Sequence, residues 1–340
     1  MILVTGGTGL LGSHLLVELT NRGKKVRALV RDYNQTAHVK KLYRLLPGTS
    51  ELQYSLIEWV EGDITDITSI DQALVGVDEV YHCAALVSFY SGDNALMMKI
   101  NAAGTANIVN ACLKHNIRKL LHVSSVAALG IPETGDIIDE KALWKPSGKN
   151  SGYAISKYSA EREVWRGIAE GLNAVIVNPS VILGVSFKSA SSNQVFQNLN
   201  RLHQFYTGGS NSYIDVRDVA TIMILLMESD INAQKFLLTN ENLSFREFIS
   251  TGTDILGKKP PYIPLNRALL SLLWRLNYVY SWIARTKPLF TPEIVRPLSR
   301  KQKYSSAKFL ESFSYTFIPV KQSLADGFRM LGFSVEKTNR

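Results

Sequence analysis

A glycine-rich stretch near the start of the chain, TGGTGLLG at residues 5–12, constrains the fold more than any other feature. The apolar run 1–4 before it predicts a buried strand, and the apolar spacing of residues 13–19 after it predicts a helix. Three of its glycines would allow a sharp turn, a close approach of backbone to a pyrophosphate and tight packing of helix on strand. The positive N-terminal end of such a helix attracts anions. We therefore predict a dinucleotide-binding loop here.

The remainder of the chain alternates apolar strand patterns with helical patterns. This rhythm is typical of βαβ units and predicts a parallel, doubly wound sheet, which is a Rossmann-type α/β fold. We expect a dinucleotide-binding domain over 1–184, to which 213–240 returns, and a smaller C-terminal substrate-binding lobe over 185–212 and 241–340. Strands are expected at 24–32, 59–63, 79–85, 119–124 and 173–177, helices at 70–74, 94–115 and 153–170, and long connections at 130–150 and 185–212.

Composition limits the partners and the compartment. A net charge of +9 over 340 residues could serve a nucleic acid or an acidic membrane, but the basic residues are scattered, which favours an anionic cofactor or substrate instead. Cys83 and Cys112 form no metal-ligand spacing, so we expect no metal and a reducing compartment. Because the first residues already form a strand, we expect no signal peptide and a cytoplasmic location.

Residues 265–284 form a long, strongly apolar helical pattern. Arg267 and Arg275 interrupt it, and arginine inside a bilayer is costly, so we predict no stable membrane span. Our preferred interpretation is a lid helix over an apolar substrate pocket. A core or dimer helix and a helix lying in the membrane interface are the alternatives.

The segment YAISK at 153–157 carries a second chemical signal. A four-residue separation places Tyr153 and Lys157 on one helix face, where an ammonium group would lower the pKa of the phenol. Such a tyrosine can donate a proton to a carbonyl oxygen or remove one from an alcohol. Ser124 and Ser125 follow a predicted strand whose carboxyl end would face the ligand crevice. Each pattern also occurs on solvated helices and at ordinary strand ends, so the signal lies in their combination with the glycine-rich loop.

Eight motifs together resemble the extended short-chain dehydrogenases/reductases, the NAD-dependent epimerase/dehydratase superfamily, over nearly the whole chain. They are TGGTGLLGSH (5–14), GDITD (62–66), HCAA (82–85), NAAGTANIVNAC (101–112), HVSSVAALG (122–130), YAISK (153–157), NPSVILG (178–184) and YIDVRDVA (213–220). VRALVRD (26–32), GGSNSYIDVRDVA (208–220) and the apolar helix resemble dihydroflavonol 4-reductase-like and 3β-hydroxysteroid dehydrogenase-like members. The resemblance implies an NAD(P)-dependent oxidoreductase.

The resemblance also implies a catalytic set. Tyr153 matches the residue that exchanges a proton with the substrate oxygen, Ser125 the hydroxyl that holds this oxygen, and Lys157 the residue that binds the nicotinamide ribose and lowers the tyrosine pKa. Asn101 matches an asparagine with a structural or proton-relay role. A homodimer is implied as well, in which the helices 94–115 and 153–170 of two copies form a four-helix bundle.

Cofactor and substrate contacts follow from the same motifs. We expect the substrate near Val87, Phe89 and Tyr90, with contributions from 185–212 and 265–284. The implied cofactor contacts are Gly6, Thr8, Gly9, Leu10, Leu11, Gly12, Arg31, Asp63, Ile64, Ala84, Ala85, Val123, Ser124, Tyr153, Lys157, Pro179, Ser180 and Val181.

The end of the second predicted strand bears on the type of cofactor. An enzyme that uses NAD normally ends this strand with an acid that bonds the ribose hydroxyls, and this chain has Val30 at that place. Arg31 follows, and a guanidinium group suits a 2′-phosphate. Asp32 could instead pair with Arg31, and Arg31 could be a solvated charge at the strand end. We predict NADP (NADPH), with NAD as the alternative.

The sequence therefore predicts an NADP-dependent reductase of a ketone or aldehyde on a bulky, largely apolar substrate of dihydroflavonol, steroid or acyl type. A sugar-nucleotide epimerase or dehydratase is the first alternative. Asn211-Ser212 stands where such enzymes carry an arginine-aspartate pair, and Val126-Ala127 where dehydratases carry an acidic pair beside the catalytic serine. A non-catalytic NADP-binding sensor is the second alternative, but a sensor would not need the catalytic set.

Overall fold

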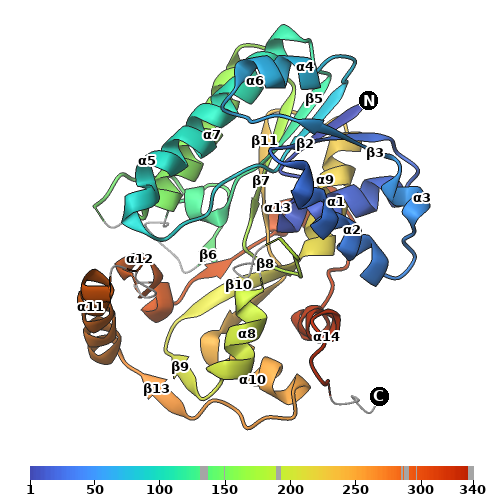
Figure 1. Cartoon of the computed structure of the whole chain (residues 1–340). Coiled ribbons are helices and arrows are strands. Elements are labelled where there is room, and N and C mark those ends of the chain that lie inside the picture. Colours follow the sequence, from blue (N-terminus) through green and yellow to red (C-terminus); the bar gives the residue numbers. More distant parts are fainter. Residues whose placement is uncertain are drawn as a thin grey trace.

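The computed structural model describes residues 1–130, 137–148, 150–188, 193–284, 286, 291–295 and 297–335. Its centre is a seven-stranded sheet in the order β11-β7-β5-β4-β1-β2-β3, in which every neighbouring pair is parallel (Figure 1). This confirms the predicted doubly wound α/β fold. The strands are β1 (Ile2–Thr5), β2 (Val26–Val30), β3 (Ile57–Glu61), β4 (Glu79–His82), β5 (Lys119–Val123), β7 (Ala174–Pro179) and β11 (Gln234–Leu238).

Helices cover both faces of this sheet, because successive strand residues point to opposite sides and both sides are apolar. Val4 packs in one buried cluster with α1 (Leu10–Asn21), α2 (Thr36–Leu45) and α9 (Val216–Glu228). Its neighbour Leu3 packs in a second cluster on the other face. The helices of that second face are α4 (Ile67–Ala73), α6 (Gly104–Lys114) and α7 (Gly152–Ala169).

The predicted helix 94–115 is continuous but not uniform. It consists of α5 (Asn94–Met97), the π-helical turn η3 (Met98–Ala103) and α6. A π turn inserts an extra residue into the helical repeat and often occurs at functional sites. The candidate residue Asn101 lies in this turn.

A second group of elements surrounds a separate apolar cluster. A three-stranded sheet of β8 (Val181–Leu183), β10 (Ser210–Asp215) and β12 (Glu241–Ser244) packs with α8 (Gln194–Arg201), α10 (Phe245–Ile255) and α14 (Val320–Met330). The proposed domain boundaries themselves stay a prediction.

The two predicted long connections contain short elements. In 185–212 these are α8, β9 (Phe205–Thr207) and the start of β10, and β9 pairs with β13 (Ile263–Leu265). In 130–150, β6 (Ile137–Ile138) pairs with β14 (Lys303–Tyr304). Parts of both connections, 131–136, 149 and 189–192, lie outside the described residues.

The predicted apolar helix is α11 (Arg267–Ala284), which projects beside the short α12 (Pro292–Val295) in Figure 1. Within the described part of the chain, no helix has the length and apolarity needed to cross a bilayer. The remaining short elements are α3 (Glu51–Tyr54), α13 (Ala307–Ser312), η1 (Tyr33–Gln35), η2 (Ser91–Asp93), η4 (Val126–Ala128) and η5 (Pro297–Ser299).

A buried lysine connects the sheet to α9. Lys119, the first residue of β5, is 1% exposed, and its Nζ donates to the carbonyl oxygens of Leu226 (2.7 Å) and Ser229 (2.6 Å). These carbonyls lie at the C-terminal end of α9, where a cation is favoured and intrahelical donors are missing. Burial lowers the pKa of Lys119. The contact therefore replaces water at a helix end that the fold has covered.

We expect Lys119→Met to destabilise the protein by about 1–3 kcal/mol, because it removes the ammonium donor from the carbonyl oxygens of Ser229 and Leu226, of which Leu226 keeps, among the described residues, only the Ser229 hydroxyl. Urea unfolding followed by circular dichroism measures this loss. The matched control is Lys114→Met, which removes only the surface ion pair with Asp71 and should cost less than about 1 kcal/mol. Equal losses in the two variants would contradict the role assigned to Lys119.

Candidate active site

The glycine-rich loop between β1 and α1 has the geometry of an anion cradle. Gly6 has φ +71°, and a Cβ there would lie 2.6 Å from the backbone nitrogen of Ala84. A Cβ on Gly12 would overlap the carbonyl oxygen of Gly6, so α1 could not pack so close to the loop. At Gly9, by contrast, a Cβ would have only the Gly6 oxygen nearby, at 3.3 Å. The surface above Gly9 is therefore open to a ligand.

The start of α1 leaves backbone donors free for such a ligand. The first intrahelical bond runs from Ser13 N to Gly9 O (3.0 Å), so the N–H groups of Leu10, Leu11 and Gly12 have no acceptor within the helix. No side chain caps this end of α1. A phosphate placed there would satisfy these donors and the positive end of the helix dipole.

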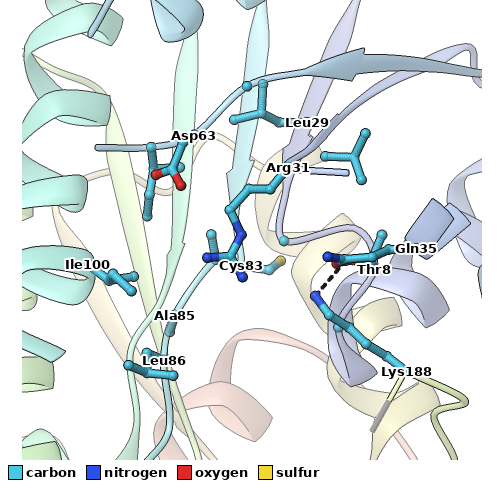
Figure 2. Close-up of a pocket in the computed structure, with 16 residues that line it drawn as sticks. Thr8, Leu29, Arg31, Gln35, Asp63, Cys83, Ala85, Leu86, Ile100 and Lys188 are labelled. Atoms are coloured by element: carbon cyan, nitrogen blue, oxygen red, sulfur yellow. Dashed lines mark hydrogen bonds between the residues drawn. The ribbon is translucent and has the colours of Figure 1, made fainter. Parts of the chain in front are cut away.

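A cleft of about 150 Å³ opens beside this loop, beyond the carboxyl ends of β1 to β4 (Figure 2). Ligands bind at this edge of doubly wound sheets because the connections diverge there. Eight residues predicted to bind the cofactor line the cleft: Gly6, Thr8, Gly9, Arg31, Asp63, Ile64, Ala84 and Ala85. Leu29, Val30, Gln35, Gly62, Cys83, Leu86, Ile100 and Lys188 complete the lining.

Lys188 is a cleft residue that the sequence analysis missed. Its Nζ donates to the Thr8 hydroxyl at 2.8 Å, across 180 positions of sequence (Figure 2). Burial, and then the nearby charge of Arg31, lowers the pKa of Lys188. Beside it, the ring of Phe187 lies 4.5 Å under the ammonium group of Lys41 on α2. No local motif could have placed this lysine, because its position depends on the path of the chain after β8.

Arg31 and Lys188 thus bring two positive side chains to one cleft. Figure 2 shows the Arg31 guanidinium in the middle of the cleft, between Asp63 on one side and Thr8 and Lys188 on the other. The Asp32 carboxylate accepts from Asn34 N (2.9 Å) and caps η1. Among the described residues, no ion pair joins Asp32 to Arg31, so the pairing considered from the sequence does not form.

The predicted catalytic serine and tyrosine meet in a second cavity of about 330 Å³. Ser125 and Tyr153 both line it, and the Ser125 hydroxyl is close enough to lower the pKa of the phenol. The ring of Phe89 meets that of Tyr153 edge-on, with centroids 6.0 Å apart. The other lining residues are Val126, Ala127, Leu129, Gly130, Ile138, Trp144, Asn150, Ser151, Ala154, Ser180, Val181, Asn211, Glu293, Arg300, Gln302 and Tyr304.

Not every predicted substrate contact belongs to this cavity. Phe89 lines it, whereas Val87 and Tyr90 do not. No described residue of α11 contributes to the lining either, so the lid interpretation of that helix finds no support there. The C-terminal part of the chain contributes instead through α12 and the segment that leads into β14.

The pKa of Tyr153 differs from the expectation. Burial raises the pKa of Tyr153, and only the hydrogen bond from Ser125 opposes this. Lys157 was expected to lower this pKa, but its Nζ donates to the carbonyl oxygen of Val123 at 2.6 Å. The prediction of a lowered tyrosine pKa was therefore wrong. Burial also lowers the pKa of Lys157, to about 8.

Glu161 is a second residue that the sequence analysis missed. It lies four residues after Lys157 on α7, and its buried carboxylate raises the Lys157 pKa against the effect of burial. Its Oε2 accepts from the Ser124 hydroxyl (2.8 Å) and from Asn178 Nδ2 (2.9 Å). Ser124 therefore points to Glu161, whereas Ser125 faces the cavity. The same four-residue spacing that identified Lys157 was the available signal for Glu161.

Asn101 acts within the protein rather than in a cavity. It is 1% exposed, its Oδ1 accepts from Leu86 N (2.7 Å), and its Nδ2 donates to Leu86 O (2.9 Å) and to the Ser156 hydroxyl (2.9 Å). It thereby holds the segment after β4 against α7. Of the two roles considered, these contacts correspond to the structural one.

The residues present fit a nicotinamide dinucleotide. The open surface at Gly9 and the free donors of α1 suit a pyrophosphate. Ser180, one of the predicted carboxamide neighbours between Pro179 and Val181, has a buried Oγ without a hydrogen-bond partner in the described part of the chain, and it lines the catalytic cavity. A buried polar atom normally has a partner, so this hydroxyl is suited to a polar group of a ligand.

Known proteins resemble the chain over its whole length. The model of the NAD dependent epimerase/dehydratase family matches residues 2–237. A protein of Synechocystis sp. named after dihydroflavonol 4-reductase is 30% identical, over 95% of this chain and 92% of its own. Cinnamoyl-CoA reductase 1 of Petunia hybrida is 26% identical, over 97% of this chain and 92% of its own.

Solved structures agree with the fold. The crystal structure of gox2253 is 30% identical, with a TM-score of 0.78 over 98% of both chains. UDP-glucose 4-epimerase of Thermotoga maritima, with UDP-glucose, has a TM-score of 0.71 at 18% identity, over 97% of this chain and 98% of its own. The chain therefore belongs to the NAD-dependent epimerase/dehydratase family, the extended short-chain dehydrogenases/reductases, and is an NAD(P)-dependent enzyme of that type.

Proposed function

We propose that this enzyme uses NADPH to reduce a ketone or aldehyde on a bulky, largely apolar substrate. The observation that carries the proposal is that Ser125 and Tyr153 lie together in the wall of one cavity, with Lys157 one helical turn from Tyr153 on α7. Reductases among its relatives, including cinnamoyl-CoA reductase and anthocyanidin reductase, support a reaction at a carbonyl group.

Each member of the catalytic set has one role in this proposal. The bound nicotinamide supplies a hydride to the carbonyl carbon. Tyr153 donates its proton to the carbonyl oxygen, so that an alcohol forms, and its raised pKa keeps it protonated at neutral pH. Ser125 orients the same oxygen. Lys157 binds the ribose, and its positive charge is supported by the buried carboxylate of Glu161.

The cavity suggests the character of the substrate. The lining of the cavity contains many apolar side chains, including the aromatic rings of Phe89, Trp144 and Tyr304. Asn211, Gln302 and Arg300 add polar groups. A substrate with a wide apolar body and one polar end would satisfy both parts, as expected for a pocket that fixes orientation through few polar groups.

A sugar-nucleotide epimerase is the second candidate, and Arg300 in the cavity is the observation that favours it, because a guanidinium group suits a diphosphate. Three other lining residues oppose a sugar-nucleotide enzyme. Asn211 lies where such enzymes carry an arginine, and Val126 and Ala127 lie beside Ser125 where dehydratases carry an acidic pair. Solved epimerases at 18% identity support only the fold.

We further propose that the protein is a cytoplasmic homodimer. Leu96, Met98 and Ile155 expose apolar side chains on α5, η3 and α7, the helices of the expected four-helix bundle. Cys83 and Cys112 are both free thiols, and burial raises the pKa of each to about 12, which suits a reducing compartment.

Tyr153→Phe should lower kcat for NADPH-dependent carbonyl reduction by about 10²–10⁴-fold, because the proton donor is lost. Steady-state assays of NADPH oxidation with a panel of aromatic and steroid ketones and aldehydes measure kcat. Fluorescence titration should give an unchanged NADPH affinity. The matched control is Tyr158→Phe on the same helix, since Tyr158 stacks on Trp144 with centroids 4.6 Å apart and lines no described cavity. Near-full activity of Tyr153→Phe would overturn the mechanism.

The pH dependence follows from Lys157. With its pKa at about 8, Lys157 is charged below that pH and loses its charge as the pH rises. We therefore expect kcat/KM for reduction to fall above about pH 8, since this parameter reports the free enzyme. In Lys157→Arg the guanidinium stays charged, so this alkaline fall should move to higher pH even if the rate is lower. An unmoved profile would exclude Lys157 as its origin.

Arg31→Gln and Lys188→Met should each weaken NADPH binding by about 10–100-fold, the value of one charge-assisted hydrogen bond, and leave NADH binding within about threefold. Calorimetric titration of both cofactors measures the ratio. Lys40→Met, which removes a surface lysine paired with Glu51, is the control. NAD retained by the purified protein in mass spectra, or equal losses for both cofactors, would contradict the NADP assignment and favour the epimerase.

A further inference from the structure

The helix α11 exposes an apolar face, whereas an ordinary surface helix exposes a polar one. Its inward face contains Leu270, which is 3% exposed, together with Trp274 one turn later and the buried Ser281. Four other leucines, at i, i+3, i+4 and i+7, lie on one face and are exposed. They are Leu269 (39%), Leu272 (53%), Leu273 (39%) and Leu276 (58%). The helix thus presents a face of four leucines to the outside.

Basic residues predominate in the sequence around α11. Between Asp254 and Glu293 the sequence contains no acidic residue, but it contains Lys258, Lys259, Arg267, Arg275, Arg285 and Lys287. Arg267 and Arg275 are exposed on α11 itself, and the Arg275 guanidinium lies 5.0 Å from the ring of Trp274. Tyr262 and Tyr278 expose amphipathic rings near the two ends of the leucine face.

We propose that the leucine face of α11, formed by Leu269, Leu272, Leu273 and Leu276, lies in the interface of an anionic phospholipid membrane. An interfacial helix combines apolar residues on one side with lysine, arginine and aromatic residues around it, and the basic residues add attraction to anionic headgroups. A partner protein would need a complementary acidic rim, and a lid would need to touch the cavity. An anionic membrane accounts for both the exposed leucines and the exposed arginines of α11.

The position of α11 suggests a function for the membrane contact. The helix packs against α12, whose residue Glu293 lines the catalytic cavity, and the Thr291 hydroxyl before α12 donates to the Phe89 carbonyl oxygen at 2.8 Å. The membrane-facing helix is therefore adjacent to the wall of the substrate cavity. An apolar substrate dissolved in the bilayer would reach the enzyme on that side.

The test is co-sedimentation of the full-length protein with vesicles of phosphatidylcholine, with and without phosphatidylglycerol. We expect binding to the phosphatidylglycerol vesicles, less binding in high salt, and a loss of at least about tenfold in the double variant Leu272→Glu/Leu276→Glu, because two leucines that would enter the membrane interface are replaced by anions. Leu52→Glu, at a leucine of α3 that is 76% exposed, is the matched control and should bind like the wild type.

Three results would overturn the proposal: no binding by the wild type, equal binding by the double variant, or equal binding to neutral vesicles. Light scattering distinguishes a remaining occupant. A wild-type oligomer that the double variant dissociates would show that a second copy covers the leucine face. Circular dichroism and the thermal midpoint verify that the variants fold, which is expected because the substituted side chains are exposed.

Discussion

One buried carboxylate, that of Glu161, ties the catalytic helix to the sheet. It accepts hydrogen bonds from Ser124 after β5 and from Asn178 on β7, and Lys235 on β11 approaches it at 3.4 Å. Asn178 also donates to the backbone oxygen of Ser125 at 3.0 Å. A charge removed from water needs several partners, and here the partners come from three strands. This anchor, together with the bond from Lys157 to the Val123 carbonyl oxygen, holds the helix that carries Tyr153 and Lys157 beside Ser125.

The sequence predicted those features whose cause is local. The glycine-rich loop, the alternation of strand and helix patterns that predicts a parallel sheet, and the tyrosine-lysine spacing each follow from residues close in sequence, and the structure agrees on the fold. Ser125 was distinguished from Ser124 by the family motif, and the two hydroxyls do point in different directions.

What escaped prediction depends on distant segments. Lys188 contacts Thr8 across 180 positions of sequence, and no short motif predicts such a contact. The pKa of Tyr153 was predicted in the wrong direction because burial, which the sequence does not report, outweighs the single hydrogen bond from Ser125. The π turn around Asn101 was likewise invisible, since a helical apolar pattern tolerates one extra residue.

The positive charge of the cofactor cleft has two origins in the chain. Arg31 directly follows β2 of the sheet. Lys188 lies between β8 and α8, at the start of the predicted substrate-binding lobe. A recombinant chimaera that exchanged only the second lobe with that of a relative would therefore also exchange half of this charge. In the evolution of such enzymes, a change of substrate lobe would carry with it a change in how the cofactor is held.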